Sequence, residues 1–219
     1  MKLENIKVYD LEESLVASGY PMRTVLTPRE PDEKDIKRGL SLTKASTGNG
    51  AHGQWLTGVR VAFDLTCTNK MWVEAERYRF LEFVSSQSTM HRICKFDLDK
   101  AYCKYVDPRV INIMKEKVAE YNKLQETFSA LPDGVSEELR KDYQELIKKK
   151  YLEILYTNPA GFELTARMTT NYRCLLNIYI QRWDHRLPEW REFCAKLLEL
   201  PHFSELVDAY RAGKVNAEI

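Results

Sequence analysis

Alternating apolar and polar residues predict one clear strand, over residues 58–67. Val59, Val61, Phe63 and Leu65 alternate with Arg60, Ala62, Asp64 and Thr66, the period-two pattern of a sheet with one buried face. The preceding segment, residues 24–53, is rich in Pro, Gly, Ser and charge, and it predicts irregular backbone after a short element around residues 6–16. From Thr68 the period changes and predicts a helix through residues 68–83, interrupted by the polar cluster at 85–89.

The second half of the chain predicts helices. Asp107 followed by Pro108 marks a helix start, and the apolar stripe beyond it ends near Pro132-Asp133-Gly134. Ser136 begins a second helix that runs to Asn158. Further helices are predicted over residues 169–181, 188–201 and 204–211, the last ended by Gly213. We therefore expect a helix-rich α+β fold in a single domain, residues 1–219, with the helical pair 107–156 as a subregion.

Composition narrows the classes of partner. The 219 residues carry 33 Lys plus Arg and 32 Asp plus Glu, a net charge of +1, so anion binding has to be local and general nucleic-acid or membrane binding is disfavoured. The start of the chain shows no signal peptide and no apolar run long enough to span a bilayer, which predicts a cytoplasmic protein. Five widely spaced cysteines predict reduced, mostly buried thiols and no structural metal.

A first polar constellation spans residues 74–92. Arg77, Arg79 and Arg92 flank the hydroxyl and amide groups of residues 85–88, and guanidinium with short neutral donors suits a phosphate and a base. The alternative is an exposed helix with Glu–Arg pairs followed by a hydroxyl-rich turn. Taken alone, this segment favours that alternative.

A second constellation lies on the helix expected over residues 169–181. Asn171, Arg173, Asn177, Gln181 and Arg182 place polar groups on an otherwise apolar helix, which implies either solvent or a polar ligand. Asn171 and Arg182 would lie roughly 16 Å apart on a helix, about the reach of a bound nucleotide.

Two better-known motifs are absent or fail. Residues 48–53 match G-x-G-x-x-G, but a polar loop precedes them and a strand follows, so the dinucleotide-binding interpretation is rejected and flexible glycines beside His52 remain. The four histidines are dispersed, and no Ser–His–Asp or Cys–His pattern stands out. Any catalysis therefore depends on a cofactor.

Together the two constellations resemble the flavin-dependent thymidylate synthases. That family carries an Arg-His-Arg motif with a Ser further on, similar to Arg77-Tyr78-Arg79 and Ser88 here. Its later pattern of Pro, then Asn-x-Arg, Asn and Arg is similar to Pro159 followed by the Asn and Arg residues of the second constellation. Tyr78 replaces the motif's His, Leu155 stands where an Arg is expected, Arg92 is displaced, and Glu74 stands where Gln is usual.

The resemblance implies a small antiparallel sheet, an FAD cofactor, and reductive methylation of deoxyuridine monophosphate (dUMP) at C5 with methylenetetrahydrofolate and NADPH. It implies a homotetramer. Arg182 would be catalytic, because a guanidinium beside the pyrimidine favours its anionic form. The implied FAD contacts are His52, Arg77, Tyr78, Arg79, Asn171, Arg173, Asn177 and His185, and the implied nucleotide contacts are Glu74, Gln87, Ser88, Arg92 and Arg182.

Three alternatives stay open at this point. The departures at Tyr78 and Leu155 allow a relative that binds flavin or nucleotide without turnover, and those at the nucleotide contacts allow C5 modification of a different pyrimidine nucleotide. A nucleic-acid-binding module that uses Arg77, Arg79 and Arg92 ranks last, because the net charge is close to zero.

Overall fold

The computed structural model describes residues 1–46 and 51–217, so Gly48, Asn49 and Gly50 of the glycine motif lie outside it. The chain forms two compact units, which are described separately. Unit 1 comprises Met1–Cys67, Met71–Ser85 and Ala166–Ile219, and unit 2 comprises Thr68–Lys70 and Ser86–Thr165. A single domain over the whole chain stays a prediction.

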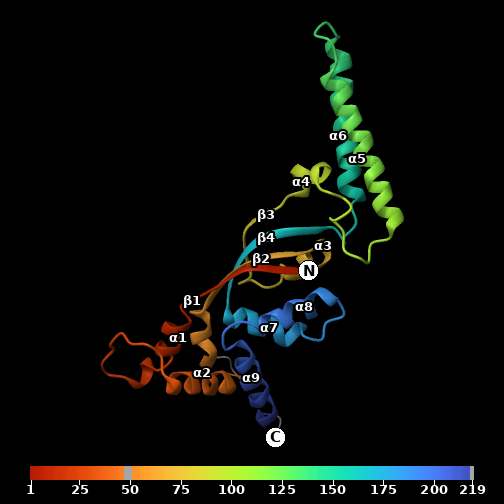
Figure 1. Ribbon diagram of the computed structural model, residues 1–219. Coiled ribbons are helices and arrows are strands. Elements are labelled where there is room, and N and C mark those ends of the chain that lie inside the picture. Colours follow the sequence, from red (N-terminus) through yellow and green to blue (C-terminus); the bar gives the residue numbers. More distant parts are fainter. Residues whose placement is uncertain (47–50, 218–219) are drawn as a thin grey trace. The chain divides into compact units, whose positions relative to one another are not determined.

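A four-stranded sheet has the order β1-β2-β4-β3 (Figure 1), with β1 Lys2–Tyr9, β2 Arg60–Thr68, β4 Glu163–Asn171 and β3 Glu82–Ser86. Strand β1 runs antiparallel to β2, with Leu3 opposite Leu65 and Val8 opposite Val61. The strand predicted over residues 58–67 is confirmed as β2, and so is the α+β class with a small antiparallel sheet. The apolar side chains of β2 are buried, and Phe63 packs on Phe193 with ring centroids 5.9 Å apart.

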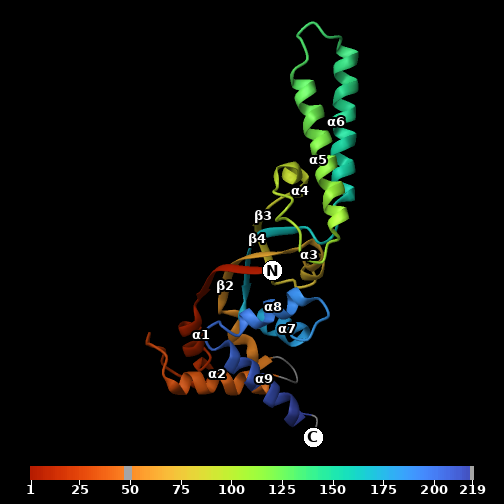
Figure 2. The same ribbon diagram turned by 45° about the vertical axis from the view of Figure 1, so that its right-hand side comes forward.

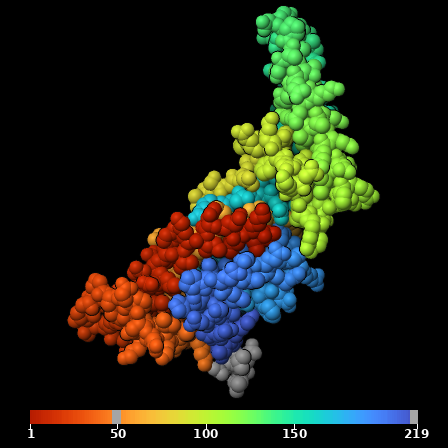
Figure 3. All heavy atoms as spheres, viewed as in Figure 1, coloured from red at the N-terminus to blue at the C-terminus, as the bar shows by residue number. Residues whose placement is uncertain are grey.

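Helices from both ends of the sequence build unit 1. They are α1 Leu11–Ala17, α2 Glu33–Ala45, α3 Asn69–Ala75, α7 Tyr172–Arg182, α8 Pro188–Leu197 and α9 Phe203–Ala217, with short 3-10 turns at η1 Tyr20–Met22 and η2 Ala51–Thr57. Helix α2 packs against α9, and the orange and blue surfaces adjoin in Figure 3. The N-terminal and C-terminal segments therefore share one core.

Helix α2 corrects the expectation of irregular backbone over residues 24–53. The side chain of Asp32 accepts the backbone N–H of Lys34 at 2.8 Å and of Asp35 at 3.0 Å, while the Asp35 carboxylate accepts the N–H of Asp32 at 3.0 Å. This reciprocal capping box starts the helix. The fully buried residues of α2 are Asp35, Gly39 and Thr43, and the apolar residues Ile36 and Leu40 on the same face are half-buried.

The buried residue Asp35 also holds arginine side chains, and we call this group the Asp35 cluster. Its carboxylate accepts Arg29 Nη2 at 2.8 Å and the Arg38 guanidinium, and Arg23 Nη2 lies 3.8 Å away. Arg38 in turn donates to the carbonyl of Leu15 at 3.0 Å, which ties α2 to α1. The hydrogen bond from Arg29 holds the pKa of Asp35 well below its usual range, although burial acts in the opposite direction.

Three other element boundaries differ from the prediction. Helix α3 ends at Ala75, and residues 82–86 form strand β3 rather than the end of that helix. Thr169, Thr170 and Asn171 are the last three residues of strand β4, so α7 begins at Tyr172 and not at residue 169. Helix α9 continues through Gly213, which was expected to end it.

Unit 2 contains an antiparallel pair of long helices, α5 Pro108–Ser129 and α6 Glu137–Thr157, which lie side by side in Figures 1 and 2. The predicted caps are confirmed: Asp107 accepts the N–H of Arg109 at 2.9 Å, and Ser136 accepts that of Leu139 at 3.3 Å. Its core includes Met114 and Ile154, near one end of the pair. The shorter helix α4 Thr89–Arg92 and the turn η3 Ile93–Lys95 complete the unit.

All five cysteines are free, and four of them are buried, which confirms the expectation of reduced, mostly buried thiols. Burial raises the pKa of Cys94 to about 11 and that of Cys194 to about 12. Within residues 1–46 and 51–217, no helix has the length and apolar character needed to cross a membrane. No cluster of three potential metal ligands occurs in this part of the chain either.

Candidate functional site

The C-terminal end of α7 carries a network centred on Arg182. Its Nη1 donates to Glu74 Oε2 at 3.0 Å, and its Nε donates to the Tyr78 hydroxyl at 2.8 Å. That hydroxyl in turn donates to Gln181 Oε1 at 3.0 Å. Arg182 and Glu74 are 13% and 16% exposed, so this ion pair is largely shielded from water. We call these residues, with His185 and Trp190, the Arg182 network.

Aromatic rings and an imidazole enclose the guanidinium. Arg182 lies 5.0 Å from the ring centroid of Trp190 and 5.7 Å from that of Tyr78, and the two rings meet edge to face at 5.8 Å. Nε2 of His185 lies 2.7 Å from Arg182 Nη1. Cation–π contact and the ion pair both stabilise the charged guanidinium.

Glu74 is anchored by more than its arginine. Nε1 of the fully buried Trp190 donates to Glu74 Oε2 at 3.0 Å, and His185 Nε2 lies 3.6 Å from the same oxygen. Helix α3 supplies Glu74, and α8 supplies Trp190. The carboxylate on α3 is therefore held by donors from two other helices, Arg182 of α7 and Trp190 of α8.

The other end of α7 presents Asn and Arg residues of the second constellation. The side chain of Asn171 accepts the backbone N–H of Cys174 at 2.9 Å and so caps the helix. Arg173 donates to the side chain of Gln54 in η2, two residues beyond the exposed His52, and Asn177 is exposed. Contacts between α7 and η2 thus bring the His52 segment to the start of this helix.

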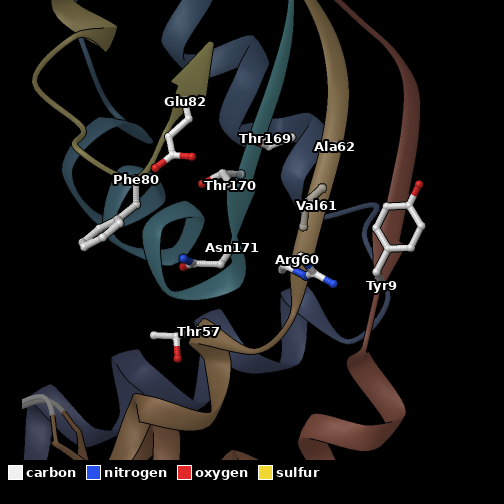
Figure 4. Close-up of a pocket in the computed structure, with 10 residues that line it drawn as sticks. All are labelled: Tyr9, Thr57, Arg60, Val61, Ala62, Phe80, Glu82, Thr169, Thr170 and Asn171. Atoms are coloured by element: carbon white, nitrogen blue, oxygen red, sulfur yellow. The ribbon is translucent and has the colours of Figure 1, made fainter. Parts of the chain in front are cut away.

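A cavity of about 520 Å³ opens beside Asn171 (Figure 4). Its walls come from the end of β4, the start of β2 and β3, and Tyr9 of β1. Thr170 lines it; this residue is 8% exposed, and its hydroxyl lies beside the Cys174 thiol but has no oxygen or nitrogen partner among the residues described. A buried hydroxyl of this kind is suited to a polar group that enters the cavity.

The remaining predicted contacts divide between the two units. In unit 1, Arg77 and Arg79 are exposed, and Arg79 lies over the Phe80 ring at 5.5 Å. In unit 2, Gln87 exchanges bonds with Thr165: its backbone N–H donates to the Thr165 carbonyl at 2.9 Å, and its side-chain oxygen accepts the Thr165 N–H at 3.0 Å.

Ser88 and Arg92 also belong to unit 2. Ser88 stands at the N-cap position of the short helix α4, and Arg92 is the exposed last residue of that helix. The structure therefore gathers Glu74, Tyr78, Arg182 and His185 into one network, and it keeps Gln87, Ser88 and Arg92 in a separate unit.

Gln54 and Thr170 are among the residues of these sites that were not predicted from the sequence. Gln54 partners Arg173, and the only local signal was its place two residues after His52. Thr170 lines the cavity from among the last three residues of strand β4, a strand that the sequence pattern did not reveal.

The fold is that of the flavin-dependent thymidylate synthases. The flavin-dependent thymidylate synthase ThyX from Helicobacter pylori, complexed with FAD and dUMP, aligns with a TM-score of 0.64 at 16% identity, over 95% of this chain and 99% of that one. A second crystal structure of this enzyme with FAD and dUMP aligns at 0.62 and 15% identity over the same shares. The sequence itself matches no family profile and no curated protein.

Proposed function

We propose that this chain is an FAD-dependent enzyme that methylates dUMP at C5. The observation that carries the proposal is the Arg182 network, at the end of the same helix whose first turns carry Asn171 and Arg173. The structural neighbours are complexed with FAD and dUMP, and they share the fold over nearly the whole chain. In the proposed reaction, methylenetetrahydrofolate supplies the carbon and NADPH supplies the reducing equivalents.

The residues around α7 fit a flavin dinucleotide. Asn171, Arg173 and Asn177 offer amide and guanidinium donors on the first turns of the helix, where an anionic pyrophosphate is favoured. The buried hydroxyl of Thr170 adds a polar group in the adjoining cavity. When bound, the flavin supplies hydride chemistry that no side chain of this network offers. His52, Arg77, Tyr78, Arg79 and His185 complete the proposed cofactor contacts.

Arg182 is the proposed catalytic residue. Two elements hold its guanidinium at fixed distances from Glu74 and Tyr78, so it needs little reorganisation to donate to a pyrimidine carbonyl. Glu74, Gln87, Ser88 and Arg92 are the other proposed nucleotide contacts. Assembly as a homotetramer is part of the same proposal.

A second candidate is a relative that binds flavin and nucleotide without turnover. The ion pair between Arg182 and Glu74 favours this candidate, because a carboxylate beside the guanidinium lowers the positive potential offered to an electron-rich ring.

The test starts from the visible absorption spectrum of the purified protein, before and after addition of FAD and gel filtration. Retained flavin absorbance together with conversion of dUMP to the 5-methyl nucleotide, in the presence of methylenetetrahydrofolate and NADPH, is the expected result. Flavin and dUMP binding without product would instead support the second candidate. Failure to retain FAD would contradict both.

Two arginine-to-alanine variants test the catalytic role proposed for Arg182. Arg182→Ala is expected to lower kcat/KM for dUMP about 100-fold, the scale of a lost hydrogen-bond donor at a developing anion. Arg186→Ala removes an exposed arginine four residues further on and serves as the matched control. Equal losses in the two variants would contradict the role assigned to Arg182.

A further inference from the structure

Glu74 and Arg182 form a neutral pair at the heart of the proposed nucleotide site. The Arg182 guanidinium donates to the Glu74 carboxylate at 3.0 Å, and both side chains are mostly shielded from water. An isolated guanidinium would favour a pyrimidine ring that has lost its N3 proton, because opposite charges stabilise the ionised form. A guanidinium that is already paired with a carboxylate stabilises the ionised ring much less.

A second donor also holds Glu74 in place beside Arg182. Trp190 is fully buried and donates its Nε1 to the same Glu74 oxygen at 3.0 Å. Rotation of the Glu74 carboxylate away from Arg182 would break two hydrogen bonds, and it would leave the buried Trp190 Nε1–H without an acceptor. A ligand at Arg182 therefore meets the negative charge of Glu74 as well.

The other ionisable groups near the pair come from several elements. Tyr78 follows α3, and its hydroxyl accepts from Arg182 Nε at 2.8 Å; His185 follows α7, and its Nε2 lies 3.6 Å from Glu74. Cys194 of α8 also lies near Arg182, and burial raises the pKa of its thiol to about 12. Only Glu74 places a carboxylate against the guanidinium among the contacts that the described residues show.

From these contacts we infer that Glu74 is a specificity-determining residue that makes the site select the neutral, N3-protonated form of a pyrimidine nucleotide. The inference rests on the proposed function, since it concerns the same nucleotide site. The carboxylate repels an ionised ring and offsets the attraction of Arg182, so the protonated ring is the form that binds more tightly.

The experiment compares two ligands that differ in the acidity of the N3 proton. 5-Fluoro-dUMP loses this proton more readily than dUMP. The dissociation constant of 5-fluoro-dUMP divided by that of dUMP therefore reports which ring form the site prefers. Protonation changes of the protein itself affect both constants equally and cancel in this ratio. We expect this ratio, measured by calorimetry on the wild-type chain, to rise about tenfold between about pH 7 and about pH 9. A ratio that falls over this range would overturn the inference.

Glu74→Gln tests the residue directly, because the amide keeps the shape and an acceptor for Trp190 but removes the charge. The ratio is expected to stay level or fall in this variant. Glu76→Gln makes the same charge change at an exposed residue two positions on, and it should behave as the wild type. A rise in Glu74→Gln equal to that of the wild type would also overturn the inference.

The wild-type profile keeps the test decisive even where Glu74→Gln does not fold. The outcomes also separate the inference from the proposed function. Binding of dUMP with the opposite pH trend contradicts the role of Glu74 and leaves the nucleotide site standing. Absence of binding by both nucleotides, in every variant and in the presence of FAD, contradicts the proposed function and with it the inference.

Discussion

Asp35 and Glu74 both lie in unit 1 and both hold arginine side chains, but their surroundings differ. Asp35 is completely buried, closes a helix cap and meets Arg23, Arg29 and Arg38. Glu74 meets one arginine, and aromatic rings enclose the pair.

The two carboxylates therefore stabilise different things. In the Asp35 cluster two of the carboxylate contacts also fix helix backbone: the capping box starts α2, and Arg38, which the carboxylate holds, donates to the carbonyl of Leu15 in α1. In the Arg182 network the contacts of Arg182 and Glu74 join side chains near the ends of α3, α7 and α8, while His185 Nδ1 accepts the backbone N–H of Leu187 at 3.2 Å. We conclude that the first cluster serves the fold, and we propose that the second serves a ligand.

The largest expected effect is on the stability of unit 1. Asp35→Ala leaves partly buried guanidinium groups without their carboxylate and removes half of the capping box, which should lower the free energy of unfolding by about 3 kcal/mol. Urea denaturation followed by tryptophan fluorescence measures this, because Trp55, Trp72, Trp183 and Trp190 all belong to unit 1.

Glu33→Ala is the matched control for Asp35→Ala. Glu33 is an exposed acid on the same helix, paired with Lys37 four residues on, and a surface pair of this kind contributes about 0.3 kcal/mol. Similar losses in the two variants would contradict a special role for the Asp35 cluster.

The contribution of Asp35 to stability should also depend on pH in the acid range. The pKa of Asp35 is lowered in the folded state, so its contribution is fully present above the unfolded value of about 4 and is lost as the pH falls towards the folded value. The stability gap between the wild type and Asp35→Ala is therefore expected to narrow as the pH falls from about 5 to about 2. A gap that stays constant would show that the carboxylate is not the titrating group.

The smallest expected effect is in the Arg182 network. Tyr78→Phe removes the hydroxyl that accepts from Arg182 and donates to Gln181 but keeps the ring. The stability of unit 1 should fall by no more than about 1 kcal/mol, whereas the dissociation constant for dUMP should rise several-fold. Tyr20→Phe, at an exposed tyrosine of the same unit, is the control. A loss in Tyr78→Phe as large as in Asp35→Ala would erase the contrast between the two clusters.

The sequence predicts elements well where their buried face is apolar. Strand β2 and the paired helices α5 and α6 are confirmed because alternation, caps and proline positions all agree there. Helix α2 was missed because its apolar face is short, with Ile36 and Leu40 beside the fully buried Asp35, Gly39 and Thr43. Strand β4 was missed for a related reason, since it ends in the polar residues Thr169, Thr170 and Asn171.

The candidate site also has a part that the sequence predicts and a part that only the fold shows. Asn171, Arg173 and Arg182 lie within twelve consecutive residues, at the N-cap and along helix α7, so this group was visible in the sequence. The bond between Arg182 and Glu74 joins residues 108 positions apart, and no local pattern encodes such a contact. The sequence showed that Glu74 departs from the family pattern, but only the fold shows that it meets the arginine.

The paired helices of unit 2 have a consequence for local dynamics. Each is about 30 Å long at 1.5 Å per residue, yet the fully buried residues Met114 and Ile154 lie near one end, and towards the turn the contacts include the half-buried rings Phe128 and Tyr143. Amide hydrogen exchange should therefore quicken steadily from the Met114 end towards the turn. Deletion of one helical turn from α5 and one from α6, next to the loop that joins them, would shorten the pair and leave its core intact. The length of the helical pair can therefore vary without a change of fold.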